Sequence, residues 1–448
     1  MTGNGVHASP VRGRVALVLP GGGARGAYEV GALSVLLPVL EARGERVSLL
    51  CGTSVGAINA ALLGSLAHLP AAAQAELMLE RWRCLRREDV VAPLIGTGLP
   101  LQLARLAGDA LRLPGVRRGS LLDPRPLRRF LERRLDWEGL HRNVADGFVD
   151  AVCVMATQLA SGSPVAFVEA AGPANPGGER DPLPAGADFP YVRVRLAHEH
   201  VRASAAMPLV FPAVEVHAPE EARGFYTDGA TRLNSPIKPA VELGADRVIV
   251  IGFEPLRREA WAAPEHVPPH LVDVLANMLD GLLVDQVSDD VHRMVAINAF
   301  FAESASVGTV PSARAYRAAR GRRPYRRISY ALVTPERPRE LGRLALDTFA
   351  NRYGGLRAAT SPPDLLLLGR LLRGRTDAGG DLLSFLFFDE VYVEALIEAG
   401  RRDARRWLAR HPVFWCSDGS HDFDIAPVLD PSAQEAASLD EWRSLRRG

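Results

Sequence analysis

The chain has 448 residues, a formal net charge of +1 and an apolar fraction of 47%. This length allows one large domain with additions or two to three ordinary domains, and the near-zero charge excludes a protein-wide field that would attract nucleic acid or membrane. No run of 18 or more apolar residues occurs, so we expect no transmembrane helix and at most peripheral contact with a membrane. Residues 1–13 are expected to be a disordered tail without signal-peptide character.

Strands and helices are predicted to alternate along the chain from residue 15. Val15–Leu19 is an apolar run followed by three glycines, which indicates a buried strand and a turn. A helix is predicted over Gly26–Arg43, although Pro38 must kink or end it. Val47–Cys51 is predicted as a second strand and Val55–Ala67 as a buried helix. Further strands are expected at Phe148–Met155, Val165–Val168, Phe225–Thr227, Arg247–Phe253 and Arg327–Val333.

This alternation predicts an α/β fold with a mostly parallel central sheet. Residues 171–189 read as a loop rich in Pro, Gly and Ala, and Leu271–Ala302 as one long helix or two short ones. Beyond Thr334 only helical segments are evident: residues 340–353, 364–375 and 391–411. We therefore divide the chain into the tail, a sheet-bearing domain over 14–335 and a helical C-terminal region over 336–448.

The cysteines are scattered and contain no CxxC pair, so neither a zinc site nor a disulfide framework is predicted. A reduced, cytoplasmic setting follows as the default. No EF-hand loop or acidic cluster is present, and we expect no metal and no cofactor. Lys238 is the single lysine among 53 basic residues, a bias that suggests a GC-rich bacterial genome.

A candidate nucleophile lies between the second predicted strand and the helix that follows it. Gly52-Thr53-Ser54-Val55-Gly56 fits the pattern G-x-S-x-G in the strand–turn–helix context that this pattern requires. Such a sharp turn projects the serine hydroxyl from the sheet, and its crowding requires glycine two residues on either side. The alternative is a chance match in which Ser54 only caps the helix.

A glycine-rich run follows the first strand. It consists of Gly21, Gly22, Gly23, Ala24, Arg25 and Gly26. The run also matches the dinucleotide fingerprint G-x-G-x-x-G, but the nearby acidic residues, Glu41 and Glu45, precede the second strand, whereas that fingerprint needs an acid at its end. Backbone N–H groups of such a run can instead stabilise an oxyanion beside a nucleophile. A close-packed turn that binds nothing is the remaining alternative.

The acid that follows the strand at Phe225–Thr227 is Asp228, within Asp228-Gly229-Ala230. Taken alone, Asp before Gly is usually a turn. A Ser-Asp-His triad would need a histidine after the acid. The later histidines occupy loops, a charged helix or the C-terminal end rather than a glycine-rich strand end, which favours a site without histidine; they are His266, His270, His292, His411 and His421.

Together and in this order, GGGARG, GTSVG and DGA resemble the patatin-like phospholipase family. Two further blocks resemble it as well: ASAAMP with FPAV at residues 203–214, where Ala213 replaces the usual second proline, and Asn234-Ser235-Pro236-Ile237. The resemblance covers roughly residues 15–255, and it is specific because five motifs agree in order. It implies a three-layer α/β fold, and it makes residues 14–335 the catalytic domain.

The resemblance implies a Ser-Asp dyad in which Ser54 is the nucleophile and Asp228 the base. It assigns the oxyanion hole to the run Gly21–Gly26, through backbone N–H groups around Gly22, Gly23 and Ala24, with Arg25 holding the loop or adding positive potential. Gly52, Gly56, Gly229 and Ala230 support the turns. The implied reaction is hydrolysis of a carboxylic ester of an acyl lipid through an acyl-enzyme, without a cofactor. Because an ordinary aspartate is a feeble base for a serine hydroxyl, we expect Asp228 to be buried and hydrogen-bonded to Ser54.

Other interpretations stay open at this point. The same dyad serves an acyltransferase, GGGARG alone would suit a nucleotide-binding module, and the C-terminal helices would suit a non-catalytic interaction protein. Leu99–Leu113 is amphipathic and fits a lid, an interfacial segment or an ordinary surface helix. Arg314–Arg327 is a basic run that suits anionic lipid or, more simply, a solvated loop; no nucleic-acid partner is expected.

Overall fold

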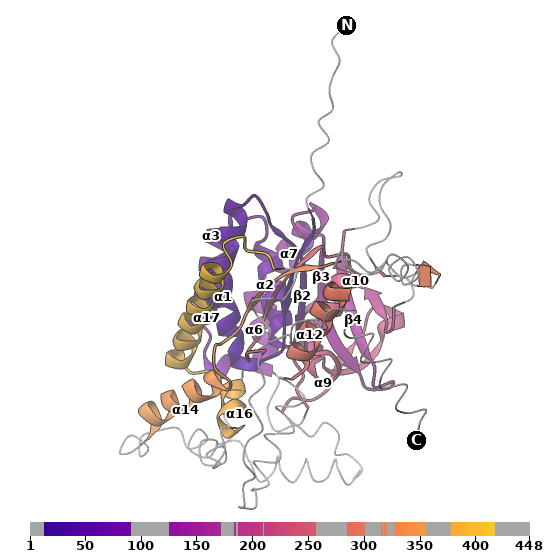
Figure 1. Cartoon of the computed structure of the whole chain (residues 1–448). Coiled ribbons are helices and arrows are strands. Elements are labelled where there is room, and N and C mark those ends of the chain that lie inside the picture. Colours follow the sequence, from indigo (N-terminus) through magenta and orange to yellow (C-terminus); the bar gives the residue numbers. More distant parts are fainter. Residues whose placement is uncertain are drawn as a thin grey trace, which may run out of the picture.

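The structure is a computed structural model of the chain, and it describes residues 13–90, 125–171, 183–184, 187–208, 210–256, 285–300, 315–316, 318–319, 327–354 and 378–416. These residues form a nine-stranded, mostly parallel sheet with helices against both faces, as Figure 1 shows. The predicted α/β fold is confirmed. The predicted segments at Leu99–Leu113 and Asp364–Arg375 lie outside the described residues, as does most of Arg314–Arg327.

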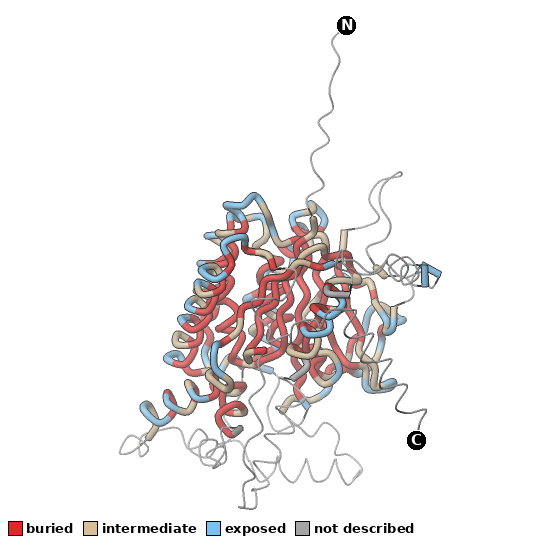
Figure 2. The backbone as a smooth tube through the Cα atoms, in the orientation of Figure 1, coloured by how far each residue is buried: buried red, intermediate tan, exposed pale blue. Residues whose placement is uncertain are grey.

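The centre of the sheet consists of parallel strands. β1 (Val15–Leu19) lies between β2 (Val47–Thr53) and β8 (Arg247–Ile251), while β3 (Ala151–Gln158) continues the sheet beyond β2 and β9 (Ser329–Val333) beyond β8. These strands are almost entirely buried, as Figure 2 shows. Because helices cover both faces, the sequences of these strands are continuous apolar runs without polar alternation.

The sheet becomes antiparallel beyond β3. β4 (Pro164–Ala170) pairs antiparallel with β3 and parallel with β5 (Tyr191–Arg193). β7 (Gly224–Asp228) pairs antiparallel with the end of β3 and with β6 (Val214–Val216). β3 begins and ends three residues later than predicted, because its last residues pair with β7. The three-residue strands β5 and β6 are too short to leave an apolar pattern in the sequence, and the prediction lacks them.

Two groups of helices cover the sheet. α1 (Gly26–Ala42), α2 (Val55–Leu66) and α7 (Trp137–Ala145) belong to one face, and α10 (Ile237–Glu242) and α12 (Asp285–Phe300) to the other (Figure 1). The further helices before residue 256 are α3 (Ala71–Arg83), α4 (Arg87–Val90), α6 (Arg125–Arg134), α8 (His198–Ser204) and α9 (Ala230–Leu233).

Of the two outcomes predicted for Pro38, a kink or an end of the first helix, the end is excluded, because α1 continues past it to Ala42. Proline removes one backbone hydrogen bond, but Leu37 and Leu40 on either side of it are buried in the core. Packing of the apolar face therefore outweighs the local preference of one residue.

Residues after β9 are helical where they are described: α14 (Glu340–Tyr353), α16 (Ala378–Leu386) and α17 (Glu390–Arg410). α17 lies along α1 with the two backbones in contact. A Cβ atom on Gly31 would lie 2.2 Å from the carbonyl oxygen of Ile397, and one on Gly400 would lie 2.1 Å from that of Tyr28. The division of the chain at residue 335 stays a prediction, but these helices pack directly on the sheet-bearing part.

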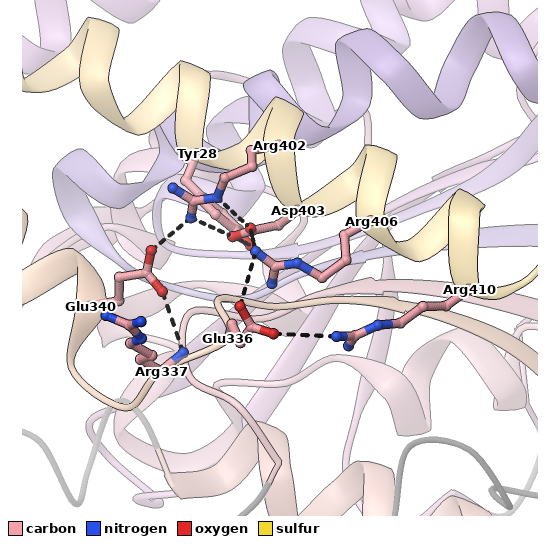
Figure 3. Close-up of polar contacts among 8 residues, drawn as sticks. All are labelled: Tyr28, Glu336, Arg337, Glu340, Arg402, Asp403, Arg406 and Arg410. Atoms are coloured by element: carbon pink, nitrogen blue, oxygen red, sulfur yellow. Dashed lines mark hydrogen bonds and ion pairs between the residues drawn. The ribbon is translucent and has the colours of Figure 1, made fainter.

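Polar contacts reinforce this packing, as Figure 3 shows. The buried hydroxyl of Tyr28 in α1 donates to Asp403 Oδ2 in α17 at 3.0 Å. Arg402 and Arg406 both pair with Asp403 Oδ1 at 2.9 Å, and Arg402 also donates to Glu340 of α14 at 2.7 Å. Because Asp403 is buried but has three polar partners, its charge is compensated and the three helices are joined.

Candidate active site

Ser54 occupies a strained turn between β2 and α2. Its φ of 54° and ψ of −121° are rare for a residue with a side chain. Glycine is required on both sides: a Cβ on Gly52 would lie 2.2 Å from the carbonyl oxygen of Gly56, and one on Gly56 would lie 2.1 Å from that of Leu19. Ser54 does not cap the helix with its side chain. The interpretation of this serine as a simple helix cap therefore fails.

The hydroxyl of Ser54 donates instead to Asp228 Oδ2, at 2.7 Å. Asp228 is the last residue of β7, and its Oδ1 accepts the backbone N–H of Ala230 at 2.8 Å. Gly229 allows the turn to pass close to β3, since a Cβ there would lie 2.4 Å from the carbonyl oxygen of Met155. Oδ1 is thus oriented by the turn that carries it, and Oδ2 by the hydroxyl of Ser54.

Asp228 is 1% exposed and Ser54 is 7% exposed. Burial raises the pKa of Asp228 to about 7, although the hydrogen bonds from Ala230 and Ser54 lower it in part. A carboxylate with this pKa is a far stronger base than an ordinary aspartate, and it is still largely ionised just above neutrality.

The glycine-rich run begins against the serine. The N–H of Gly21 donates to Asn234 Oδ1 at 2.7 Å, and a Cβ on Gly21 would lie 2.9 Å from Cβ of Ser54. Gly23 has a φ of +57°, a conformation that favours glycine.

Three N–H groups of the run already have acceptors: those of Gly21, Arg25 and Gly26. Those of Gly22, Gly23 and Ala24 donate no hydrogen bond to any described residue. Of these three residues, Gly23 lines the same pocket as Ser54.

Ser204, at the end of α8, joins the two turns. Its Oγ accepts the backbone N–H of Ser54 at 2.8 Å, and its carbonyl oxygen accepts that of Gly229 at 3.3 Å. The motif blocks contain Ser204 and Asn234, but no role was predicted for either of them. No local pattern predicts which distant amide a buried polar side chain accepts.

Ser54 opens onto an apolar cavity of about 890 Å³, part of which is open to solvent. Its described walls come from the glycine-rich run and from helices α2, α3, α6 and α16. The apolar side chains that line it include Ile58, Leu62, Trp82, Leu127, Met207 and Phe385. Arg81 and Arg134 also line it. A flexible hydrocarbon chain fits such a cavity, because burial of apolar surface is the main source of affinity there.

Arg25 does not line the cavity; its side chain is fully buried behind the glycine-rich run. Its Nε donates to Ser384 Oγ at 2.6 Å, and its Nη2 donates to Asp381 Oδ1 at 2.9 Å. Both partners belong to α16, in the C-terminal region.

The dinucleotide interpretation of the glycine-rich run has no support in this geometry. Glu41 accepts the N–H of Ala71, and Glu45 binds Arg247 and Trp415. Both glutamates precede β2 and so lie at the opposite end of the sheet from the run. A ribose bound at the run would be out of reach of either.

The two described histidine candidates contact their own helices. His292 Nδ1 lies 2.7 Å from the carbonyl oxygen of Ser288, and the His411 ring stacks on Trp407. His266, His270 and His421 lie outside the described residues. Within the part of the chain that the structure describes, no helix is long and apolar enough to cross a membrane, and no cluster of three or more potential metal ligands occurs.

Comparison with known proteins identifies one family. The sequence model of the family described as patatin-like phospholipase matches residues 17–241. No curated protein matches the chain. Among solved structures, VipD from Legionella pneumophila is similar, with 12% sequence identity and a TM-score of 0.33 over 89% of this chain and 67% of VipD.

Proposed function

Because the chain belongs to the patatin-like phospholipase family, we propose that it is a serine hydrolase that cleaves carboxylic esters of acyl lipids with Ser54 as nucleophile and Asp228 as base. The observation that carries this proposal is the 2.7 Å hydrogen bond from the Ser54 hydroxyl to the buried carboxylate of Asp228. A hydroxyl within hydrogen-bond reach of a base whose pKa lies near neutrality is the arrangement that nucleophilic catalysis needs.

In the first half of the reaction, Asp228 takes the proton of the Ser54 hydroxyl as Oγ attacks the ester carbonyl carbon. The carbonyl oxygen gains the negative charge, and the free amides of Gly22, Gly23 and Ala24 stabilise it. Collapse of the tetrahedral species breaks the bond to the alcohol, which leaves with the proton held by Asp228. The acyl group stays on Ser54, with its chain in the apolar cavity.

In the second half, water donates a proton to Asp228 and its oxygen attacks the acyl-enzyme. The second tetrahedral species uses the same amides, and its collapse returns the proton to Ser54 and releases the carboxylic acid. An alcohol in place of water would give a new ester. Product analysis therefore separates a hydrolase from a transacylase.

The test is turnover of long-chain acyl esters by the wild type, Ser54→Ala and Asp228→Asn. We expect both variants to lose activity by about a thousandfold or more while they keep the wild-type circular dichroism spectrum. Ser65→Ala is the matched control, because Ser65 lies in the same helix and only donates to its own backbone at Leu62. Retention of turnover by Ser54→Ala would overturn the proposal.

A further inference from the structure

α16 contacts the glycine-rich run through its backbone as well as its side chains. A Cβ on Gly23 would lie 2.2 Å from the carbonyl oxygen of Phe385, so the run and α16 are in backbone contact. The ring of Phe385 lies under the guanidinium of Arg25, 4.3 Å from its centre, and also lines the cavity. The glycine-rich run thus lies between Ser54, which Gly21 contacts, and α16, which Gly23 contacts.

Among the described residues, the hydrogen-bond partners of the Arg25 guanidinium all belong to α16. Nε donates to Ser384 Oγ, and Nη2 donates to both Oδ1 and the carbonyl oxygen of Asp381. Nη1 is buried and has no hydrogen-bond partner among the described residues. Its position therefore depends on Asp381 and Ser384.

Asp381 is itself fixed. It is 2% exposed, it lies in the first turn of α16, and its second oxygen lies 3.5 Å from Arg339 Nε. Ser384 is held in turn, because its hydroxyl donates to the carbonyl oxygen of Asp381 at 2.5 Å. A buried arginine that donates to a carboxylate oxygen, a carbonyl oxygen and a hydroxyl of one helix has little freedom of its own, so it transmits the position of α16 to the backbone it carries.

Arg25 ends the turn whose amides are free. The N–H of Arg25 donates to the carbonyl oxygen of Gly22 at 3.1 Å, which closes the turn over Gly23 and Ala24. A shift of the Arg25 side chain therefore moves the amides that the proposed reaction uses. Displacement of such donors by a fraction of an ångström weakens the stabilisation of the transition state more than it weakens substrate binding.

We propose that Asp381 is a positioning residue for ester hydrolysis: through Arg25 it fixes the amides of Gly22, Gly23 and Ala24 where the oxyanion forms. The proposal rests on the proposed function of Ser54 and Asp228. It assigns part of the active site to the C-terminal region, beyond residues 17–241 that the family model matches.

The experiment measures kcat and KM for a long-chain ester with the full-length wild type and Asp381→Asn. The asparagine keeps the size of the side chain and an oxygen for Arg25 but removes the charge. We expect kcat to fall about 10- to 100-fold with KM changed less than threefold. The rate of phosphonylation of Ser54 by a long-chain alkyl fluorophosphonate should fall by the same factor as kcat, because negative charge also builds on the phosphoryl oxygen at these amides in the transition state for displacement of fluoride.

Asp403→Asn is the matched control. Asp403 is also a buried acid that joins the C-terminal region to the N-terminal part of α1, but its partners are Tyr28, Arg402 and Arg406. We expect it to lower the melting temperature and leave kcat within twofold of the wild type. A purely structural role for Asp381 would make the two variants alike. Equal kcat values for Asp381→Asn and wild type would overturn the proposal.

A second variant tests the proposal in case Asp381→Asn does not fold. Ser384→Ala keeps the ion pair but removes the acceptor of Arg25 Nε and the hydrogen bond to the carbonyl oxygen of Asp381. We expect a loss in kcat of about threefold to tenfold, again with KM unchanged. Unchanged kcat in Ser384→Ala would count against the proposal. Loss of activity in Ser54→Ala, measured alongside, separates this outcome from failure of the proposed function.

Discussion

Thr53 and Asp228 lie beside consecutive residues of one strand, since Thr53 pairs with Met155 and Asp228 with Ala156 of β3. β2 and β7 therefore follow each other along the same edge of β3, and they approach this point from opposite directions. The two turns that leave them, one carrying Ser54 and the other Asp228, meet where the strands end. Backbone pairing therefore brings the hydroxyl of Ser54 and the carboxylate of Asp228 into contact.

The rate of ester hydrolysis should depend on the ionisation of Asp228. Because burial raises its pKa to about 7 and only the carboxylate accepts a proton, kcat/KM should fall about tenfold for each pH unit well below 7 and level off above it. A pH–rate profile between pH 5 and 9 measures this. A flat profile over this range, which an aspartate titrating near pH 4 would give, would contradict the buried base.

The raised pKa of Asp228 also lowers the stability of the folded protein at neutral and higher pH. The folded state holds the proton up to about pH 7, whereas the unfolded chain releases it near pH 4, so the free energy of unfolding decreases as pH rises from about 4 to about 7. Asp228→Asn should therefore be more stable than the wild type at pH 8, and this advantage should disappear at pH 4. Urea denaturation at both pH values tests it. Equal stability at pH 8 would indicate that the carboxylate is well solvated.

The two glycines of α2 should respond differently to alanine. Gly56→Ala should destabilise the fold by about 3 kcal/mol or more, because its methyl group would meet the backbone of Leu19 at 2.1 Å. Gly64→Ala, in the same helix, brings its methyl group no closer than 3.3 Å to a side chain of β3, and we expect a change within about 1 kcal/mol. Thermal or urea unfolding compares the two. Comparable losses would show that the turn at Ser54 can relax.

Ile58 should influence acyl-chain length. It lies one helical turn after Ser54 and lines the cavity, so Ile58→Trp fills space near the serine. We expect the preferred substrate to become shorter, with kcat/KM for a C16 ester reduced about tenfold or more and that for a C4 ester changed less than threefold. Val391→Trp, at an exposed position outside the cavity, is the control. A uniform loss for all chain lengths in Ile58→Trp would argue against acyl binding in this cavity.

The sequence predicted those parts of the fold and of the candidate site that depend on local constraints. Tight turns need glycine at fixed spacings, and this identified the segments around Ser54 and Asp228, which the structure brings into contact. Continuous apolar runs identified the central strands. The catalytic roles of these residues stay predictions.

The remaining features depend on contacts between distant segments. Arg25 and Ser384 are 359 positions apart, and nothing near either residue specifies the other. The end of β3 pairs with both β4 and β7, which lie on its two edges. α1 continues past Pro38 because buried neighbours hold it in place. Local sequence reasoning cannot predict such pairings.

The contact between α1 and α17 has a consequence for the order of synthesis. Gly31 and Gly400 allow the two helices to be in backbone contact. α16, whose Phe385 lines the cavity, immediately precedes α17. During translation, Ser54 and Asp228 are synthesised long before these helices. Until they emerge, the cavity lacks one wall and Arg25 lacks its anchors. The growing polypeptide therefore carries Ser54 in an unfinished pocket, and we expect the proposed hydrolysis only after the C-terminal helices have been translated.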